Sequence, residues 1–164
     1  PSRHVHSLRN WLRAARDKSY SFSVKHMKPQ LTDQTLELIF RLIALQPPPD
    51  SIWLIGSRAN GRATEESDAD LVVFGSEALL SSVRLKIKKP QAVDCLVVFN
   101  GDDYQDPWQE KSGSLSRLKW LQVDATSAKY IGSKWVPDEE SSIEFHANLG
   151  VLVCRQERAI RIWP

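Results

Sequence analysis

Two aspartates separated by one residue precede an apolar run in the middle of the sequence. Asp68 and Asp70 flank Ala69 and come just before Leu71-Val72-Val73-Phe74. In an extended segment, residues i and i+2 point to the same side, so both carboxylates can face the same cations while Ala69 faces the core. Mg²⁺ prefers oxygen ligands of this kind and completes its shell with waters and phosphate oxygens. The pair is therefore a candidate metal clamp for chemistry on phosphates.

A third carboxylate, Asp94, lies inside another apolar run. Its neighbours are Val93 and Cys95-Leu96-Val97-Val98, and burying a carboxylate among them is costly without a cation or a donor. If this run is a neighbouring strand, Asp94 approaches Asp68 and Asp70, and a bound cation relieves their repulsion. Asp94 could then also accept the proton of an incoming hydroxyl group.

A glycine and a serine follow the first apolar run, where a strand would end. Gly56 and Ser57 come directly after Ile52-Trp53-Leu54-Ile55. Glycine lets backbone amides approach a phosphate closely, and the Ser57 hydroxyl can donate to a β- or γ-phosphate oxygen. Arg58 or Arg62 can add positive charge beside a polyphosphate, or can equally face solvent.

The segments that must position these residues alternate between strands and helices. Short apolar runs predict buried strands, and apolar positions at helical spacing behind a capping residue predict helices. The predicted elements are a helix near 33–46 capped by Thr32 or Asp33 and stopped by Pro47-Pro48-Pro49, a strand over 52–55, a strand over 71–74, a helix capped by Ser76 that closes with Lys86, Lys88 and Lys89 before Pro90, and a strand over 93–99.

Beyond residue 100 the pattern is weaker. Residues 101–118 are polar and lack a period, which predicts a loop. Strands are predicted over 118–123 and 130–136, and a hairpin over 151–154 and 159–163 around the turn Arg155-Gln156-Glu157-Arg158. Residues 33–100 thus form the signature core, and residues 101–164 an extension to which the sequence assigns no role.

The length of 164 residues favours one domain spanning residues 1–164. The net charge of +2 hides an asymmetry, because residues 1–30 hold seven arginines and lysines against Asp17 alone. A short amphipathic helix is predicted over 5–17. A solvated helix face is favoured for this basic segment over a nucleic-acid contact.

Other features of the composition exclude several classes of protein. No apolar run is long enough for a membrane span, and the N-terminal residues lack the apolar core of a secretory signal, so a cytoplasmic location is expected. Cys95 and Cys154 lack the spacing of a metal cluster or disulfide framework. The histidines lack the paired spacing of a zinc site: His4, His6, His26 and His146.

The strings GSRANG, SDADLVV and VDCLVV together resemble the signature of nucleotidyltransferases of the DNA polymerase β-like superfamily, in particular its minimal, MNT-type members. The resemblance covers residues 52–99. It implies an α/β fold with a small mixed sheet flanked by helices. It also implies phosphate contact by Gly56 and Ser57, with Arg58 as a further candidate for binding the nucleotide. The candidate catalytic and metal-binding residues are Asp68, Asp70 and Asp94.

The activity implied by the resemblance is transfer of a nucleoside monophosphate from an NTP, with ATP favoured, to an acceptor hydroxyl. Mg²⁺ or Mn²⁺ would be required, and pyrophosphate would be released. The acceptor could be a protein, an RNA 3′ end or a small molecule. One departure concerns Asn60, because many minimal members carry Ala-Arg-Gly where this chain has Ala59-Asn60-Gly61. The role of that position is therefore open.

Two readings from other classes stay open alongside the enzyme. Minimal members often pair with a helical HEPN protein in toxin–antitoxin modules, which ranks a protein acceptor slightly first by analogy. The chain could instead be a binding or antitoxin module that neutralises a partner without catalysis. It could also be an RNA-binding accessory domain that uses the basic residues 1–30. The sequence leaves the acceptor and the oligomeric state open.

Overall fold

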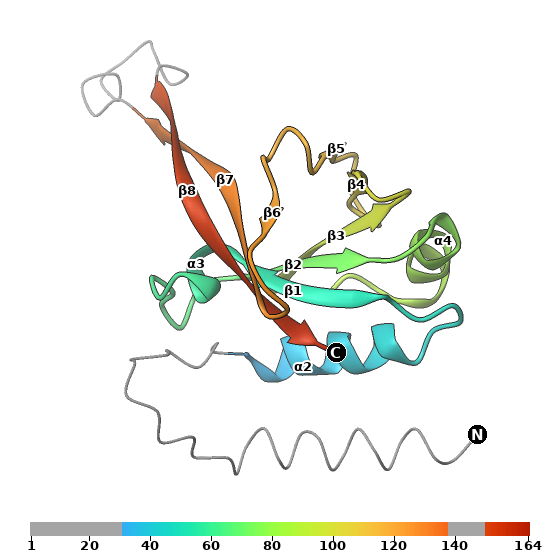
Figure 1. The fold of residues 1–164 in the computed structure, drawn as a ribbon. Helices are drawn as coiled ribbons and strands as arrows, with labels where there is room; N and C mark the ends of the chain where they lie inside the picture. Colours follow the sequence, from blue (N-terminus) through green and yellow to red (C-terminus); the bar gives the residue numbers. More distant parts are fainter. Residues whose placement is uncertain (1–30, 138–149) are drawn as a thin grey trace, which may run out of the picture.

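The computed structural model describes residues 31–137 and 150–164, so the helix predicted over 5–17 lies outside the described residues. The described residues form one eight-stranded sheet and three helices (Figure 1). The elements are α2 (Asp33–Ile43), β1 (Ser51–Ile55), α3 (Gly56–Ala59), β2 (Ala69–Phe74), α4 (Glu77–Lys86), β3 (Val93–Phe99), β4 (Asp103–Gln105), β5 (Ser112–Ser114), β6 (Leu121–Gln122), β7 (Ser127–Pro137) and β8 (Gly150–Trp163).

The sheet is mixed, as predicted. Its strand order is β5-β4-β3-β2-β1-β8-β7-β6. Strands β2 and β3 run parallel, and every other pair of neighbours in the described sheet is antiparallel. Because β8 pairs with β1, the predicted extension and the signature core share one sheet. None of the helices described is long and apolar enough to cross a membrane.

The two longer helices form where their caps and apolar stripes predict. The side chain of Thr32 accepts a hydrogen bond from the backbone N–H of Thr35, and α2 buries Leu38 and Leu42. The helix ends at Ile43, three residues before the predicted end, ahead of the prolines that exclude a helical continuation. Ser76 caps α4 by accepting a hydrogen bond from Leu79 N–H.

The two faces of the sheet bury different partners. One face packs on α2 and α4, with Leu54, Leu71 and Val97 among its core residues. The other face holds a second core, in which Trp53, Val72 and Val98 pack against residues of β7 and β8. The sequence predicted helices flanking the sheet. In the part of the chain that the structure describes, the helices contribute to the first core alone. Along β2 and β3, Asp70 and Asp94 alternate with residues of the first core. Their side chains therefore lie on the second face, which no helix covers in the described residues.

The polar segment predicted as a loop over 101–118 contains two short strands, and that prediction was wrong in part. Strand β4 pairs with the edge of β3, and β5 pairs with β4. Gly113 makes the second pairing possible, because a side chain there would collide with the ring of Tyr104 on β4. Short polar strands of this kind leave no apolar alternation by which a sequence pattern could find them.

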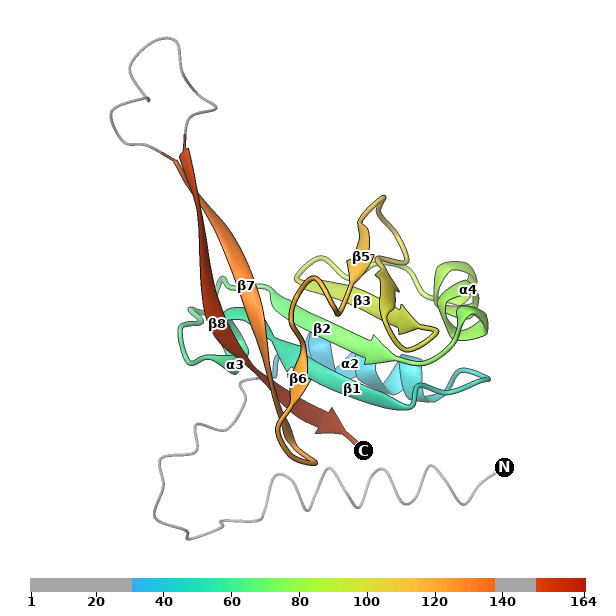
Figure 2. The ribbon, with the colours of Figure 1, turned by 45° about the horizontal axis from the view of Figure 1, so that its top comes forward.

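The hairpin predicted around Arg155-Gln156-Glu157-Arg158 was also wrong. Residues 150–163 form the single strand β8, which pairs with β7 along its length and with β1 near its end. The four polar residues contain no glycine, proline or asparagine to make a turn, and Glu157 is buried with ion-pair partners. Figures 1 and 2 show β7 and β8 as a long twisted pair that extends away from the body of the molecule.

The two remaining strand predictions found the right region with different ends. The strand predicted over 130–136 is the longer β7, and the one predicted over 118–123 is the two-residue β6. Asp124 lies in the turn between them, where its carboxylate accepts hydrogen bonds from the backbone N–H groups of Thr126 and Ser127. This turn sets the register in which β7 returns along the sheet.

Candidate functional site

Asp70 and Asp94 stand side by side on neighbouring parallel strands. The register of β2 and β3 places Asp70 opposite Asp94, while Ala69 is fully buried in the first core, as predicted. Asp68 lies in an exposed segment just before β2. The pKa of Asp70 is raised from 3.8 to about 6, first by burial and then by the negative charge of Asp94, with a further contribution from Asp68. Asp94 and Asp68 therefore each lie near enough to Asp70 to disfavour its negative charge.

Two lysines partly neutralise the negative charge of these carboxylates. Lys89 Nζ lies 2.8 Å from Asp94 Oδ1, and Lys111 opposes the rise in the pKa of Asp70. Helix α4 ends at Lys86, so Lys89 lies beyond it and contacts the site instead of serving the helix end as the sequence suggested. Lys111 belongs to the segment predicted as a loop. Sequence reasoning missed both as site residues, because neither lies in a motif.

The donor set fits a hard divalent cation. Carboxylate oxygens are the ligands that Mg²⁺ and Mn²⁺ prefer, and a cation would favour the charged form of Asp70, whose pKa is raised first by burial and then by repulsion from Asp94. Within residues 31–137 and 150–164 no three acidic, histidine or cysteine side chains are grouped closely enough to bind one ion as they stand. Asp94 is bound by Lys89 in this arrangement. Binding of a divalent ion by Asp68, Asp70 and Asp94 therefore stays a prediction.

Gly56 begins the turn beside Asp70 and has no room for a side chain. Ile55 at the end of β1 pairs with Asp70, and the next residue, Gly56, has a positive φ of 69°. A Cβ added there would collide with the Asp70 carboxylate. Ser57 follows in the short helix α3 and is half-buried. The glycine thus lets the turn lie directly against a candidate metal ligand.

The backbone N–H of Gly56 is bound by a residue far away in the sequence. It donates a hydrogen bond of 2.9 Å to the hydroxyl oxygen of Tyr130 on β7. The Tyr130 ring stacks on Trp120 with ring centroids 6.0 Å apart, which fixes the direction of the hydroxyl. Residues beyond 100, to which the sequence assigned no role, therefore help to hold the turn in place.

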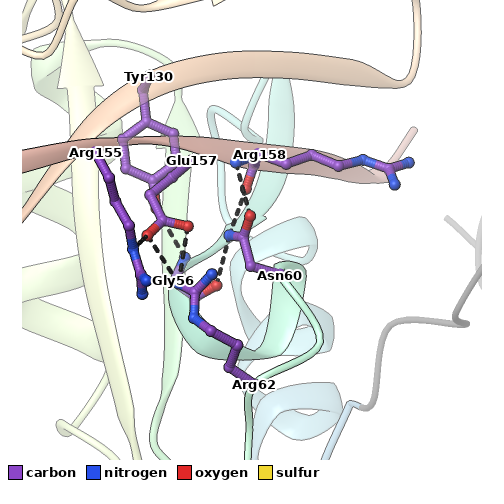
Figure 3. Close-up of polar contacts among 7 residues, drawn as sticks. All are labelled: Gly56, Asn60, Arg62, Tyr130, Arg155, Glu157 and Arg158. Atoms are coloured by element: carbon purple, nitrogen blue, oxygen red, sulfur yellow. Dashed lines mark hydrogen bonds and ion pairs between the residues drawn. The ribbon is translucent and has the colours of Figure 1, made fainter.

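Asn60 fastens the same turn to β8. Its side-chain amide donates to the carbonyl oxygens of Gly56 and Arg158 and accepts from Arg158 N–H at 2.9 Å (Figure 3). This gives a physical role to the position that departs from the Ala-Arg-Gly pattern. Asn60 joins α3 to β8, an interior strand of the sheet, and its amide is already bound on both its oxygen and its nitrogen.

Arg58 supports the segment that leads to Asp68. Its side chain is 8% exposed and donates from Nε and Nη2 to the carbonyl oxygen of Ser67, at 3.0 and 2.5 Å. These contacts connect α3 to the residue immediately before Asp68. A contact between Arg58 and a nucleotide stays a prediction, to be weighed against this role in the loop.

A buried glutamate on β8 holds two arginines beside the Gly56 turn. Arg62 Nη2 donates to both carboxylate oxygens of Glu157 at 2.8 Å, and Arg155 Nε donates to Oε1 at 2.6 Å (Figure 3). Burial alone would raise the pKa of Glu157, but the hydrogen bonds and charges of Arg62 and Arg155 outweigh it and lower the pKa. Sequence reasoning missed Glu157 and Arg155, because it placed both in a turn.

The comparisons with known proteins agree with this geometry. A family model described as a nucleotidyltransferase domain matches residues 37–149, which include Gly56, Ser57 and all three aspartates. No curated protein and no solved structure matches the chain. The match confirms the superfamily predicted from the three motifs, while the MNT-type subfamily stays a prediction. Since the matched segment covers well over half of the chain, the protein belongs to the nucleotidyltransferase domain family.

Proposed function

We propose that this protein is a Mg²⁺- or Mn²⁺-dependent nucleotidyltransferase that transfers a nucleoside monophosphate from an NTP, ATP in the first instance, to an acceptor hydroxyl. The observation that supports this most strongly is the placement of Asp70 opposite Asp94 on parallel strands, with Gly56 against Asp70. A hydroxyl oxygen of the acceptor forms a bond to the α-phosphorus, the bond from this phosphorus to the bridging oxygen breaks, and pyrophosphate leaves.

Each residue has a separate task in this proposal. Asp68, Asp70 and Asp94 hold the divalent ion, which when bound neutralises charge on the phosphates. Gly56 lets the phosphates approach the turn closely, Ser57 binds them through its backbone amide and hydroxyl groups, and Asp94 takes the proton of the acceptor hydroxyl. The hydrogen bond from Gly56 N–H to Tyr130 holds the turn before the nucleotide arrives.

The direct test is transfer of a labelled nucleotide. The full chain is incubated with each α-labelled NTP, Mg²⁺ or Mn²⁺, and a lysate that contains protein and RNA. Label on a defined acceptor is expected, and nuclease and protease treatment then separate an RNA acceptor from a protein one. The variant carrying Asp68→Asn and Asp70→Asn should leave no label. Equal labelling by the parent chain and this variant would contradict the assignment. A parent chain that gives no label but captures a partner would support a non-catalytic binding module.

Lys89 gives a prediction about the affinity for the ion. Lys89 Nζ is bound to Asp94 Oδ1 at 2.8 Å and so competes with a cation for that carboxylate. Because the pair is partly exposed, its contribution is about 1 kcal/mol or less. We expect Lys89→Met to bind Mn²⁺ about twofold to fivefold more tightly, as measured by titration calorimetry. Lys88→Met, next to it in the sequence and exposed, is the control. Weaker binding by Lys89→Met would show that Lys89 supports the ion site.

A further inference from the structure

We infer that Glu157 positions Arg62 and Arg155 as a binding pair for the β- and γ-phosphates of the NTP. This rests on the proposed function and adds to it the source of the positive charge. Glu157 and Arg155 lie on β8, outside the motifs of the core, so the C-terminal strand would complete the nucleotide site. Arg62 comes from the loop that follows α3.

Glu157, Arg62 and Arg155 together carry a net positive charge. Glu157 is 7% exposed and accepts hydrogen bonds from two guanidinium groups. One arginine would already neutralise this carboxylate, so the second leaves an excess of one positive charge. The side chains of Arg62 and Arg155 are 40% and 54% exposed. Both guanidinium groups can therefore still reach a ligand, and Arg is well suited to bidentate recognition of phosphate.

Glu157 and its two arginines lie beside the turn that would bind phosphate. Glu157 on β8 lies opposite Tyr130 on β7, and the Tyr130 hydroxyl accepts the hydrogen bond of Gly56 N–H. Figure 3 shows Arg62, Arg155 and Glu157 grouped next to Gly56. Burial raises the pKa of Tyr130; the hydrogen bond from Gly56 and the charge of Arg62 oppose this rise, while the charges of Glu157 and Asp70 add to it. The arginines and the turn are thus held by one set of contacts.

Gly132 and Asn60 fit this arrangement. Gly132 leaves room for Glu157, because a Cβ there would lie 2.8 Å from Glu157 Cγ. Asn60 is uncharged, and its amide is bound to the backbone of Gly56 and Arg158. The turn therefore obtains no positive charge from residue 60. Arg62 and Arg155 supply it from two other directions, which offsets the repulsion of a triphosphate by the neighbouring aspartates.

The experiment measures binding of ATP, pyrophosphate and AMP to the full chain by titration calorimetry with Mg²⁺ present. Arg62→Gln and Arg155→Gln are each expected to weaken ATP and pyrophosphate about tenfold, while affinity for AMP changes less than about twofold. Arg155→Lys should recover part of the loss. The matched control is Arg158→Gln on the same strand, whose side chain points away from Glu157 (Figure 3) and which should bind all three ligands like the parent.

Glu157→Gln separates positioning from charge alone. This change raises the local positive charge, so an effect of charge alone predicts tighter binding of pyrophosphate. If Glu157 positions the arginines, pyrophosphate binding weakens instead. Circular dichroism and thermal unfolding check the fold, and the two exposed arginine variants keep the test valid if Glu157→Gln does not fold.

Different results would overturn this inference and the proposed function. ATP and pyrophosphate binding that is unchanged in both arginine variants overturns the inference, even if the chain transfers nucleotides. Equal losses for AMP and pyrophosphate overturn it too, because they indicate a general structural effect. A parent chain that binds pyrophosphate through these arginines but never labels an acceptor overturns the proposed function and leaves the inference standing.

Discussion

Asp70→Asn is expected to lower the rate of nucleotidyl transfer by about a thousandfold or more. The side chain lies between Gly56 and Asp94, so an ion that neutralises the phosphates would lose a ligand at the centre of the site. An amide keeps the shape of the carboxylate but not its charge. The measurement is the initial rate of label transfer at saturating Mg²⁺. Asp50→Asn, at an exposed position before β1, is the control and should transfer like the parent.

The same substitution is expected to stabilise the ion-free fold near neutral pH. The pKa of Asp70 is about 6 in the fold, above its ordinary 3.8, because burial and then Asp94 disfavour the charged form. Between these two values the folded state binds the proton more tightly than the unfolded chain, so the free energy of unfolding falls as pH rises. The stability that the protonated Asp70 carboxyl group contributes is fully present below about pH 4 and lost above about pH 6. It amounts to about 2 to 3 kcal/mol.

Urea unfolding of both proteins in EDTA gives the test. Asp70→Asn should exceed the parent in unfolding free energy by about 2 kcal/mol at pH 7.5, and the two should converge near pH 4. Added Mg²⁺ should stabilise the parent more than the variant, because the parent has one more ligand to offer. A variant that is less stable than the parent at pH 7.5 would show that Asp70 is held by attractive contacts.

The elements that carry the three aspartates were predictable because their signals are local. Apolar runs mark β1, β2 and β3, and Ser76 and Thr32 mark two helix starts. Once the strands are known, the i and i+2 rule places Asp70 on one face and Ala69 in the core. The parallel pairing of β2 with β3 then follows from the helix between them, since parallel strands need a crossover connection.

The part of the site that lies after residue 100 could not be predicted in this way. Its residues come together through the pairing of β7 with β8 and of β8 with β1, which joins positions far apart in the chain. Glu157 looks like a turn residue in the sequence, and it becomes a buried strand residue because Arg62 and Arg155 compensate its charge. The contact between Tyr130 and Gly56 likewise depends on register, for which no motif gives a signal.

Gly56→Ala is expected to reduce both stability and transfer. Gly56 has a φ of 69°, which costs about 1 kcal/mol for a residue with a side chain. The new Cβ would also collide with the Asp70 carboxylate. We expect the free energy of unfolding to fall by about 2 to 4 kcal/mol in total. Transfer should fall by about a hundredfold or more, because small displacements at a reacting centre are costly.

Gly101→Ala separates the two causes of this loss. Gly101 also has a positive φ, of 85°, but no atom lies within 4 Å of a Cβ built there. Its substitution therefore measures backbone strain without a collision. Gly56→Ala should cost at least about 1 kcal/mol more than Gly101→Ala in urea unfolding. An equal cost would mean that the turn can move away from Asp70 without loss.

A double substitution then tests the contact between the turn and the aspartate directly. In an Asp70→Ala background the carboxylate is gone, so the Cβ at residue 56 meets no oxygen, and only the strain of the positive φ remains. Gly56→Ala should therefore lower the free energy of unfolding less in that background than in the parent. The difference between the two losses is the coupling energy of the two positions. A coupling of zero would contradict the close approach of Gly56 to Asp70, on which the placement of a phosphate beside the ion depends.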